Sequence, residues 1–341
     1  MTEDTDDLVR QLLGRSLSAE TAPAAASAPD DLYFASATDA ERDVERSQDL
    51  RHLRAVAEHV ADDANDVCGT AASYYNLVIE FRRHDDPRSA LVVARRGLRL
   101  HPTAMDLLGE ALRAATDCGD YATCEELVAA ADGFDQSLWS QRLFQWLIRY
   151  HCERIGALPG ALERALSLAE AYERRYPFSD QAYNEHARVL IAVGRVDEAG
   201  RLLHEVIFGT KGPDANDQRK VEAPRCCLTY IDEVLSGRGD PESYREISLV
   251  ARKGVQFTAQ EQPGVNMGYF LYRDAEAQDA LICALGGGLD GFANKERVRD
   301  ALRTYRCAYR LLGDREYRHT IEKRHLILSM QSGVEDEPLE P

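Results

Sequence analysis

The stretch "SYYNLVIEFRRHDDPRSALVVARRGLRLHP", residues 73–102, contains two different apolar patterns. Its first half places Tyr74, Leu77 and Phe81 at intervals of three and four residues, the spacing of one helix face. Its second half places small residues at 90, 94 and 97 and ends at Pro102. Small side chains let a second helix approach the large side chains of the first. The stretch therefore predicts a helical hairpin.

The same pattern recurs along the sequence with a period of about 34 residues. If Tyr74 is given position 4 of the frame, Leu108 takes the same position in the next unit and Tyr183 in a later one. The small residues Ala90 and Ala199 then share position 20, where two helices should touch. A longer unit fills residues 138–179. We expect helix pairs over 71–104, 105–138, 138–179 and 180–210.

These are the signature positions of the tetratricopeptide repeat, and residues 71–104 resemble one such repeat. The resemblance covers residues 70–210 well and residues 223–331 loosely. It implies an all-α fold, a right-handed α-α superhelix of tetratricopeptide type with irregular helical pairs at the C-terminal end. It does not name a ligand, because a solenoid fold serves many partners.

Composition divides the protein into five segments. We expect a largely disordered acidic arm with one short helix, then the repeats, a polar loop, degenerate helical pairs that cap the stack, and an acidic disordered tail. The corresponding ranges are 1–37, 38–210, 211–222, 223–331 and 332–341.

The net charge of −17 is concentrated at the two ends. Residues 1–66 hold 16 acidic and 6 basic side chains, and "VEDEPLEP" at 334–341 adds further acids. Acidic ends repel a phosphate backbone, so we expect no nucleic-acid partner. No apolar run is long enough to span a bilayer, and the acidic start is unlike a signal peptide. We therefore expect a cytoplasmic protein without membrane contact, and the abundant arginine and alanine suggest a bacterial one.

Cysteine and glycine patterns give little sign of chemistry. The 8 cysteines contain no Cys-x-x-Cys, so we expect reduced, mostly buried thiols and no metal. Only the vicinal pair Cys226–Cys227 is a candidate for redox chemistry. "LGGGLDG" at 285–291 lacks the context of a phosphate loop and is predicted to be a flexible loop. His151 and Cys152 are adjacent in a helix and point in different directions, so they do not form a catalytic pair. We expect no catalytic residue and no cofactor.

The first helix of each tetratricopeptide pair lines a concave groove, so the resemblance implies a set of partner-binding positions. In this protein they hold Tyr75, Ile79, Arg82, Arg83, Asp106, Arg113, Gln181, Asn184 and Arg188. Arginine binds carboxylates through two parallel hydrogen bonds, so these residues predict a groove for an acidic peptide or for the C-terminus of a partner. The alternative is that the arginines are solvated or paired with nearby acids.

The sequence thus predicts a non-enzymatic scaffold or adaptor that binds a protein or peptide partner in the groove. One alternative is a regulatory or defence-system subunit that partners a separately encoded enzyme. Another is an enzyme whose site lies within residues 210–300. Nothing in the sequence indicates an oligomeric state. A further hypothesis is that the acidic arm occupies the basic groove until a tighter acidic partner displaces it.

Overall fold

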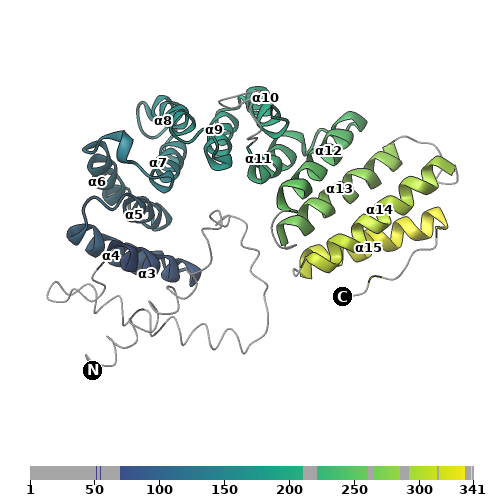
Figure 1. Cartoon of the computed structure of the whole chain (residues 1–341), viewed down its shortest axis with the longest axis horizontal. Helices are drawn as coiled ribbons and strands as arrows, with labels where there is room; N and C mark the ends of the chain where they lie inside the picture. The colour runs from purple at the N-terminus through teal and green to yellow at the C-terminus, as the bar shows by residue number, and fades with distance from the viewer. Residues whose placement is uncertain are drawn as a thin grey trace. The chain divides into compact units, whose positions relative to one another are not determined.

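The computed structural model describes residues 70–209, 221–259, 265–284, 292–312 and 315–334, together with Arg51, Arg54 and Leu339. These residues form helices joined by turns and contain no strand, which confirms the all-α prediction (Figure 1). They fall into two compact units that divide between Tyr176 and Pro177. The five predicted segments stay a prediction. The acidic arm, nearly all of the polar loop and the "LGGGLDG" segment lie outside the described residues.

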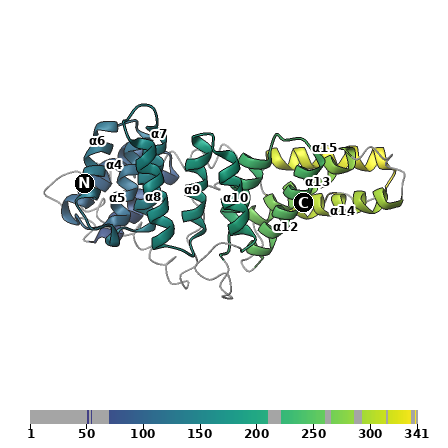
Figure 2. The same cartoon turned by 90° about the horizontal axis from the view of Figure 1, so that it is seen from above.

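Unit 1 is a stack of three helical hairpins. They are α3 (Ala71–Arg83) with α4 (Pro87–Leu100), α5 (Met105–Asp117) with α6 (Tyr121–Asp132), and α7 (Gln141–Glu153) with α8 (Ala161–Arg175). The helices of each hairpin contact one another, and α5 also contacts α3, α4 and α7. The first helices of the three hairpins therefore lie side by side, as the repeat frame predicts (Figures 1 and 2).

Residues with short polar side chains cap the N-termini of several helices. The Asp86 carboxylate accepts a hydrogen bond from the Ser89 amide at 3.2 Å, ahead of α4, and Pro87 takes the first helical position. Asp120 and Ser140 cap α6 and α7 in the same way. Gly119 has φ +68°, the left-handed conformation that ends α5 and turns the backbone toward α6.

The small positions of the frame lie where helices come closest. Ala90 and Ala199 are fully buried. A methyl group added at Gly97 would lie 2.7 Å from Leu107 Cδ2 and 2.8 Å from Tyr74 Cβ, so α4 touches both the helix before it and the helix after it through this residue. This is the close approach that the spacing of Tyr74 and Gly97 predicts. Unit 1 therefore has the helical-repeat packing of a tetratricopeptide-like fold.

Unit 2 begins with one more hairpin, α9 (Asp180–Ala192) and α10 (Val196–Ile207). It continues through α11 (Pro224–Thr229), the π-helix η2 (Tyr230–Leu235), α12 (Pro241–Thr258), α13 (Val265–Ala284), α14 (Phe292–Leu311) and α15 (Arg315–Ser332). From α12 onward each helix packs against the next, so α13 lies between α12 and α14 (Figure 1). The helices from α11 onward occupy the region for which the sequence predicts irregular helical pairs, and residues 230–235 are π-helical.

The start of α11 is fixed by a carboxylate from α9. Buried Asp180 accepts hydrogen bonds from the backbone amides of Arg225 and Cys226 at 2.8 and 3.1 Å. Two otherwise unpaired amides at the start of α11 are thus satisfied by a residue 45 positions earlier. This contact holds α11 against the first turn of α9.

No helix within the described ranges is both long enough and apolar enough to cross a membrane.

Candidate functional site

The predicted binding residues of unit 1 lie on its first helices, and one of them, Arg82, contacts a buried carboxylate. Glu110 on α5 is fully shielded from solvent. Arg82 Nη1 on α3 donates to Glu110 Oε2 at 2.9 Å, and Arg142 Nε on α7 lies 3.0 Å from Glu110 Oε1. A single carboxylate thus bridges arginines from the repeats on either side of its own. Tyr75 completes the cluster: its hydroxyl oxygen accepts a hydrogen bond from Arg142, and burial raises the pKa of this hydroxyl.

Two further arginines of this face pack on a tryptophan. The guanidinium carbons of Arg113 on α5 and Arg149 on α7 lie 4.5 and 4.9 Å from the centre of the Trp146 ring. Arginine stacked on an aromatic ring loses little further freedom when it binds a carboxylate, because its plane is already fixed. We call this surface, formed by Arg82, Glu110, Arg113, Arg142, Trp146 and Arg149, the arginine–tryptophan face.

Several donors of this face have no hydrogen-bond acceptor within the described part of the protein. Arg113 Nε and Nη1 and Trp146 Nε1 are such buried donors, and the Trp146 residue is only 5% exposed. The Asp117 carboxylate lies 3.6 Å from Arg113 Nε, an ion-pair distance that is too long for a hydrogen bond. Buried donors without acceptors cost free energy.

The charges of the face favour an anion. Four guanidinium groups, those of Arg82, Arg113, Arg142 and Arg149, face the carboxylates of Glu110 and Asp117, and Glu153 lies close to both Asp117 and Arg149. The four arginines exceed these three carboxylates by one charge. Burial raises the pKa of Asp117, and the charges of Arg82 and Arg149 oppose this shift.

The remaining predicted residues have other surroundings. Ile79 is half-buried on α3, and exposed Arg83 pairs with Glu80 at 2.8 Å. Asp106 is exposed on α5. Asn184 belongs to unit 2, where it is buried and accepts a hydrogen bond from Thr229 of α11 at 2.7 Å.

Two more predicted positions, both on α9, complete the set. Gln181 is buried beside Glu185, to which it donates, whereas Arg188 is exposed. Of the unit 2 positions in the predicted set, only Arg188 offers its side chain to solvent. The partner-binding role of the whole set stays a prediction.

The sequence frame missed the contribution of α7 and the role of Glu110. Arg142, Trp146 and Arg149 fall in the long unit, 138–179, whose extra residues take it out of the repeat frame. One feature of the sequence could have indicated these residues. In "LWSQRLFQWLIRYHCER", Arg142, Trp146 and Arg149 recur at a spacing that places them on one side of a helix. Nothing in the sequence says that Glu110 is buried.

The cysteine pair and the histidine that the sequence analysis considered for catalysis or redox chemistry are buried. Cys226 and Cys227 are fully buried, and burial raises the pKa of both thiols well above its usual value, so neither is activated as a redox thiolate. His151 is buried, and neither ring nitrogen has a hydrogen-bond partner among the described residues. Those residues also contain no cluster of His, Cys, Asp and Glu suited to a metal ion.

Burial of His151 gives a testable pH dependence. Burial, together with the nearby Arg164 charge, lowers the pKa of His151 to about 4. The unfolded protein takes up a proton at this position near pH 6.5, whereas the folded protein does not until the pH falls much further. Through His151 alone, the free energy of unfolding should therefore be about 1–2 kcal/mol lower at pH 5 than at pH 7.

We expect His151→Phe to remove this part of the pH dependence. The measurement is the free energy of unfolding by urea at pH 7 and at pH 5. His319→Phe, at a position whose side chain is 82% exposed, is the control and should keep it. The burial argument would be contradicted if His151→Phe and the unchanged protein lost the same unfolding free energy between pH 7 and pH 5.

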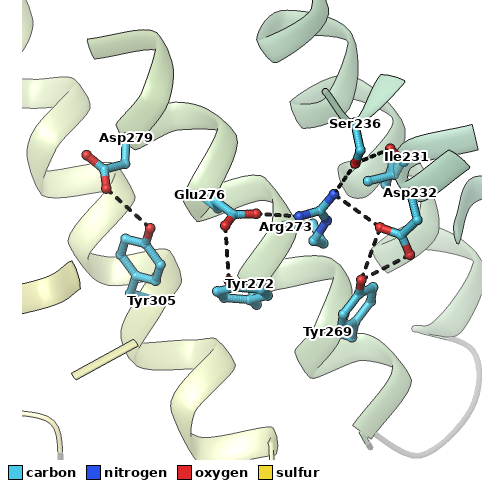
Figure 3. Close-up of polar contacts among 9 residues, drawn as sticks. All are labelled: Ile231, Asp232, Ser236, Tyr269, Tyr272, Arg273, Glu276, Asp279 and Tyr305. Carbon is cyan, nitrogen blue, oxygen red and sulfur yellow. Dashed lines mark hydrogen bonds and ion pairs between the residues drawn. The ribbon is translucent and has the colours of Figure 1, made fainter. Parts of the chain in front are cut away.

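Unit 2 contains a second polar cluster, shown in Figure 3. Arg273 of α13 lies 3.1 Å from Asp232 of η2, donates to Ser236 Oγ at 2.7 Å and pairs with Glu276. The Tyr269 hydroxyl donates to Asp232 at 3.0 Å. Ser236 donates in turn to the Ile231 carbonyl at 2.7 Å, which closes the last turn of the π-helix. The cluster therefore ties η2 to α13, and its polar groups are largely satisfied by one another.

Comparison with known proteins adds a distant likeness. No protein-family model matches the sequence, and no curated protein matches it. The solved structures that are similar include a human IFIT1 dimer with PPP-AAAA (15% identity, TM-score 0.38) and a human IFIT1 dimer with m7Gppp-AAAA (16% identity, TM-score 0.37). Each match covers 83% of this protein and 68% of the IFIT1 chain.

The prediction that nucleic acid is excluded as a partner is corrected by this comparison. Both matched structures hold a nucleotide ligand. The exclusion rested on the acidic residues 1–66 and 334–341, almost all of which lie outside the described part of the protein. Local charge governs binding at physiological salt, because interactions are screened beyond about 8 Å. The net charge of the ends therefore does not by itself exclude a basic patch on the helices. The low TM-scores transfer no ligand from IFIT1 to this protein.

Proposed function

We propose that the protein is a non-enzymatic scaffold of the tetratricopeptide-like class whose arginine–tryptophan face binds an acidic segment of a protein partner. The observation that carries the proposal is the stacking of Arg113 and Arg149 on Trp146 beside buried donors without acceptors. The Arg113 side chain is 17% exposed, and a carboxylate that reached its exposed part would accept a charge-assisted hydrogen bond, the strong kind. Arg82 and Arg142 are already held by Glu110 and act as the rigid support of the face.

A protein segment fits this face better than a nucleic acid. The face mixes arginines with the acids Glu110 and Asp117, and its aromatic ring is buried under guanidinium groups. Base stacking needs an accessible aromatic face, and phosphate binding favours a surface of one sign. Arginine and tryptophan are instead the residues that dominate protein interfaces. The alternatives of a regulatory subunit for a separate enzyme, or of an enzyme, have no comparable support from contacts.

The test measures the binding of a defined acidic probe. A fluorescent twelve-residue peptide of alternating glutamate and serine with a free C-terminus is titrated with the full-length protein, and anisotropy gives Kd. Arg113→Gln should weaken binding about ten- to a hundredfold, the value of a hydrogen bond to a charged group. Arg174→Gln, which removes a 70% exposed arginine from α8, is the matched control and should leave Kd unchanged.

Two results would contradict the proposal. One is equal affinity for Arg113→Gln and Arg174→Gln. The other is an RNA oligonucleotide that binds with the same dependence on Arg113 as the peptide, since this would make the face a phosphate site.

A further inference from the structure

The exposed side of α14 carries four arginines in one line. Arg299, Arg303, Arg306 and Arg310 recur at intervals of four, three and four residues, so they share one side of the helix. We call this set the arginine stripe. It spans about 16 Å along the helix axis at 1.5 Å per residue. Within Phe292–Leu311 six basic side chains accompany two acidic ones, in a protein whose net charge is −17.

The fold presents the stripe to solvent. α14 lies between α13 and α15 (Figure 1), and its apolar side is buried between them through Val298, Leu302 and Tyr305. Arg299, Arg303 and Arg310 are exposed on the other side, and Arg306 is half-buried. Arg303 lies 3.8 Å from Asp300, but these two side chains are 70% and 57% exposed. An ion pair that is so open to water neutralises little charge.

The like charges along the stripe repel one another. Arginines four residues apart on a helix repel each other, by about 0.2–0.5 kcal/mol for each pair. Arg299 with Arg303 and Arg306 with Arg310 are two such pairs. A bound polyanion would turn this repulsion into attraction.

We infer that the arginine stripe of α14 binds the phosphate backbone of nucleic acid, independently of base sequence. Along this side of α14 the arginines outnumber the neighbouring acids Glu296 and Asp300, and a surplus of basic side chains along a helix is the electrostatic signature of phosphate binding. Among the side chains of α14 that the structure describes, no large apolar one is exposed, whereas protein interfaces are anchored by aromatic and apolar residues. A membrane-surface helix needs a free apolar side, and that of α14 is occupied by its neighbours. The stripe belongs to unit 2, whereas the arginine–tryptophan face belongs to unit 1.

The test uses the full-length protein with a fluorescent 20-nucleotide single-stranded RNA of mixed sequence. Up to four phosphate contacts give a slope of log K against log salt of about −2 to −3, so binding should weaken roughly 15- to 60-fold between 50 and 200 mM salt. The fourfold variant R299Q/R303Q/R306Q/R310Q should abolish this salt dependence and bind at least about tenfold more weakly at the lower salt. An RNA of reversed sequence should bind equally well.

The matched control is R88Q/R174Q/R201Q/R245Q, which removes four exposed arginines from α4, α8, α10 and α12. It has the same net charge as the stripe variant and should bind RNA like the unchanged protein. Circular dichroism establishes that both variants keep their helix content. Absence of RNA binding by the unchanged protein at the lower salt would overturn the inference, as would equal losses in both variants. A polyglutamate peptide that binds more tightly than RNA with the same arginine dependence would also overturn it, because the stripe would then serve an acidic protein.

Discussion

Replacement of Glu110 by alanine is expected to lower the free energy of unfolding by about 3–5 kcal/mol, because removal of one partner from a buried ion cluster leaves the other charges unpaired. The Glu110 side chain is fully buried, and those of Arg82 and Arg142 are only 12% and 16% exposed. Without the carboxylate, two guanidinium groups from helices on either side of α5 would face each other with little water to screen them. Urea unfolding followed by circular dichroism measures the change.

The matched control is Glu126→Ala. Glu126 pairs with Arg95 at 3.4 Å, but both side chains are more than half exposed. Loss of such a surface pair should cost less than about 1 kcal/mol. If Glu110→Ala costs no more than this control, Glu110 does not organise the face, and the rigid support assigned to Arg82 and Arg142 is wrong.

Introduction of a single methyl group at Gly254 is expected to destabilise unit 2 by about 2–3 kcal/mol, through overpacking. Alanine normally stabilises a helix relative to glycine by about 1 kcal/mol, so helix propensity alone predicts the opposite sign. The added Cβ would lie within 2.6 Å of three carbons of the Phe270 ring, which is fully buried where α13 packs against α12. The measurement is again the unfolding free energy, here of Gly254→Ala.

A double-mutant cycle identifies the cause. Phe270→Leu makes room at the same contact, so the double variant should lose at least about 1 kcal/mol less than the sum of the two single losses. Arg245→Ala, at an exposed position of the same helix, is the control for helix propensity and should be nearly neutral. Additive losses, or stabilisation by Gly254→Ala, would contradict the close approach of the two helices.

The hairpins of unit 1 can be predicted from the sequence because the residues that pack together lie within one repeat of the sequence. Tyr74, Ala90 and Gly97 belong to a single repeat, and the contact of Gly97 with Tyr74 follows from their spacing. The later helices lack that spacing. The sequence pattern gives no bounds for α13 within the region of expected helical pairs, because the apolar residues of α13 surround the helix rather than follow one side. The π-helical form of residues 230–235 has no sequence signal that we recognise.

The candidate site follows from the sequence only in part, because it depends on which repeats meet. Frame positions identify Arg82 and Arg113, but they do not identify the partners Glu110 and Trp146. Asn184 has the frame position of a groove residue, yet α11 packs on α9 and buries it against Thr229. The repeat frame cannot predict that α11 covers Asn184, because the frame ends before α11 begins. The hypothesis that the acidic arm occupies the groove falls on residues outside the described ranges.

The most direct test of the proposed function observes the indole N–H groups in a ¹H–¹⁵N spectrum during titration with the glutamate–serine peptide. The protein has only 2 tryptophans, so two indole signals are expected, and Trp146→Phe identifies one of them. Trp139 is buried against Phe144, with 5.2 Å between ring centres, and serves as an internal control. We predict that the Trp146 signal shifts in a saturable manner, that the Trp139 signal stays in place, and that Arg113→Gln abolishes the shift. A bound peptide that leaves the Trp146 signal unmoved would contradict the assignment of the arginine–tryptophan face as the binding surface.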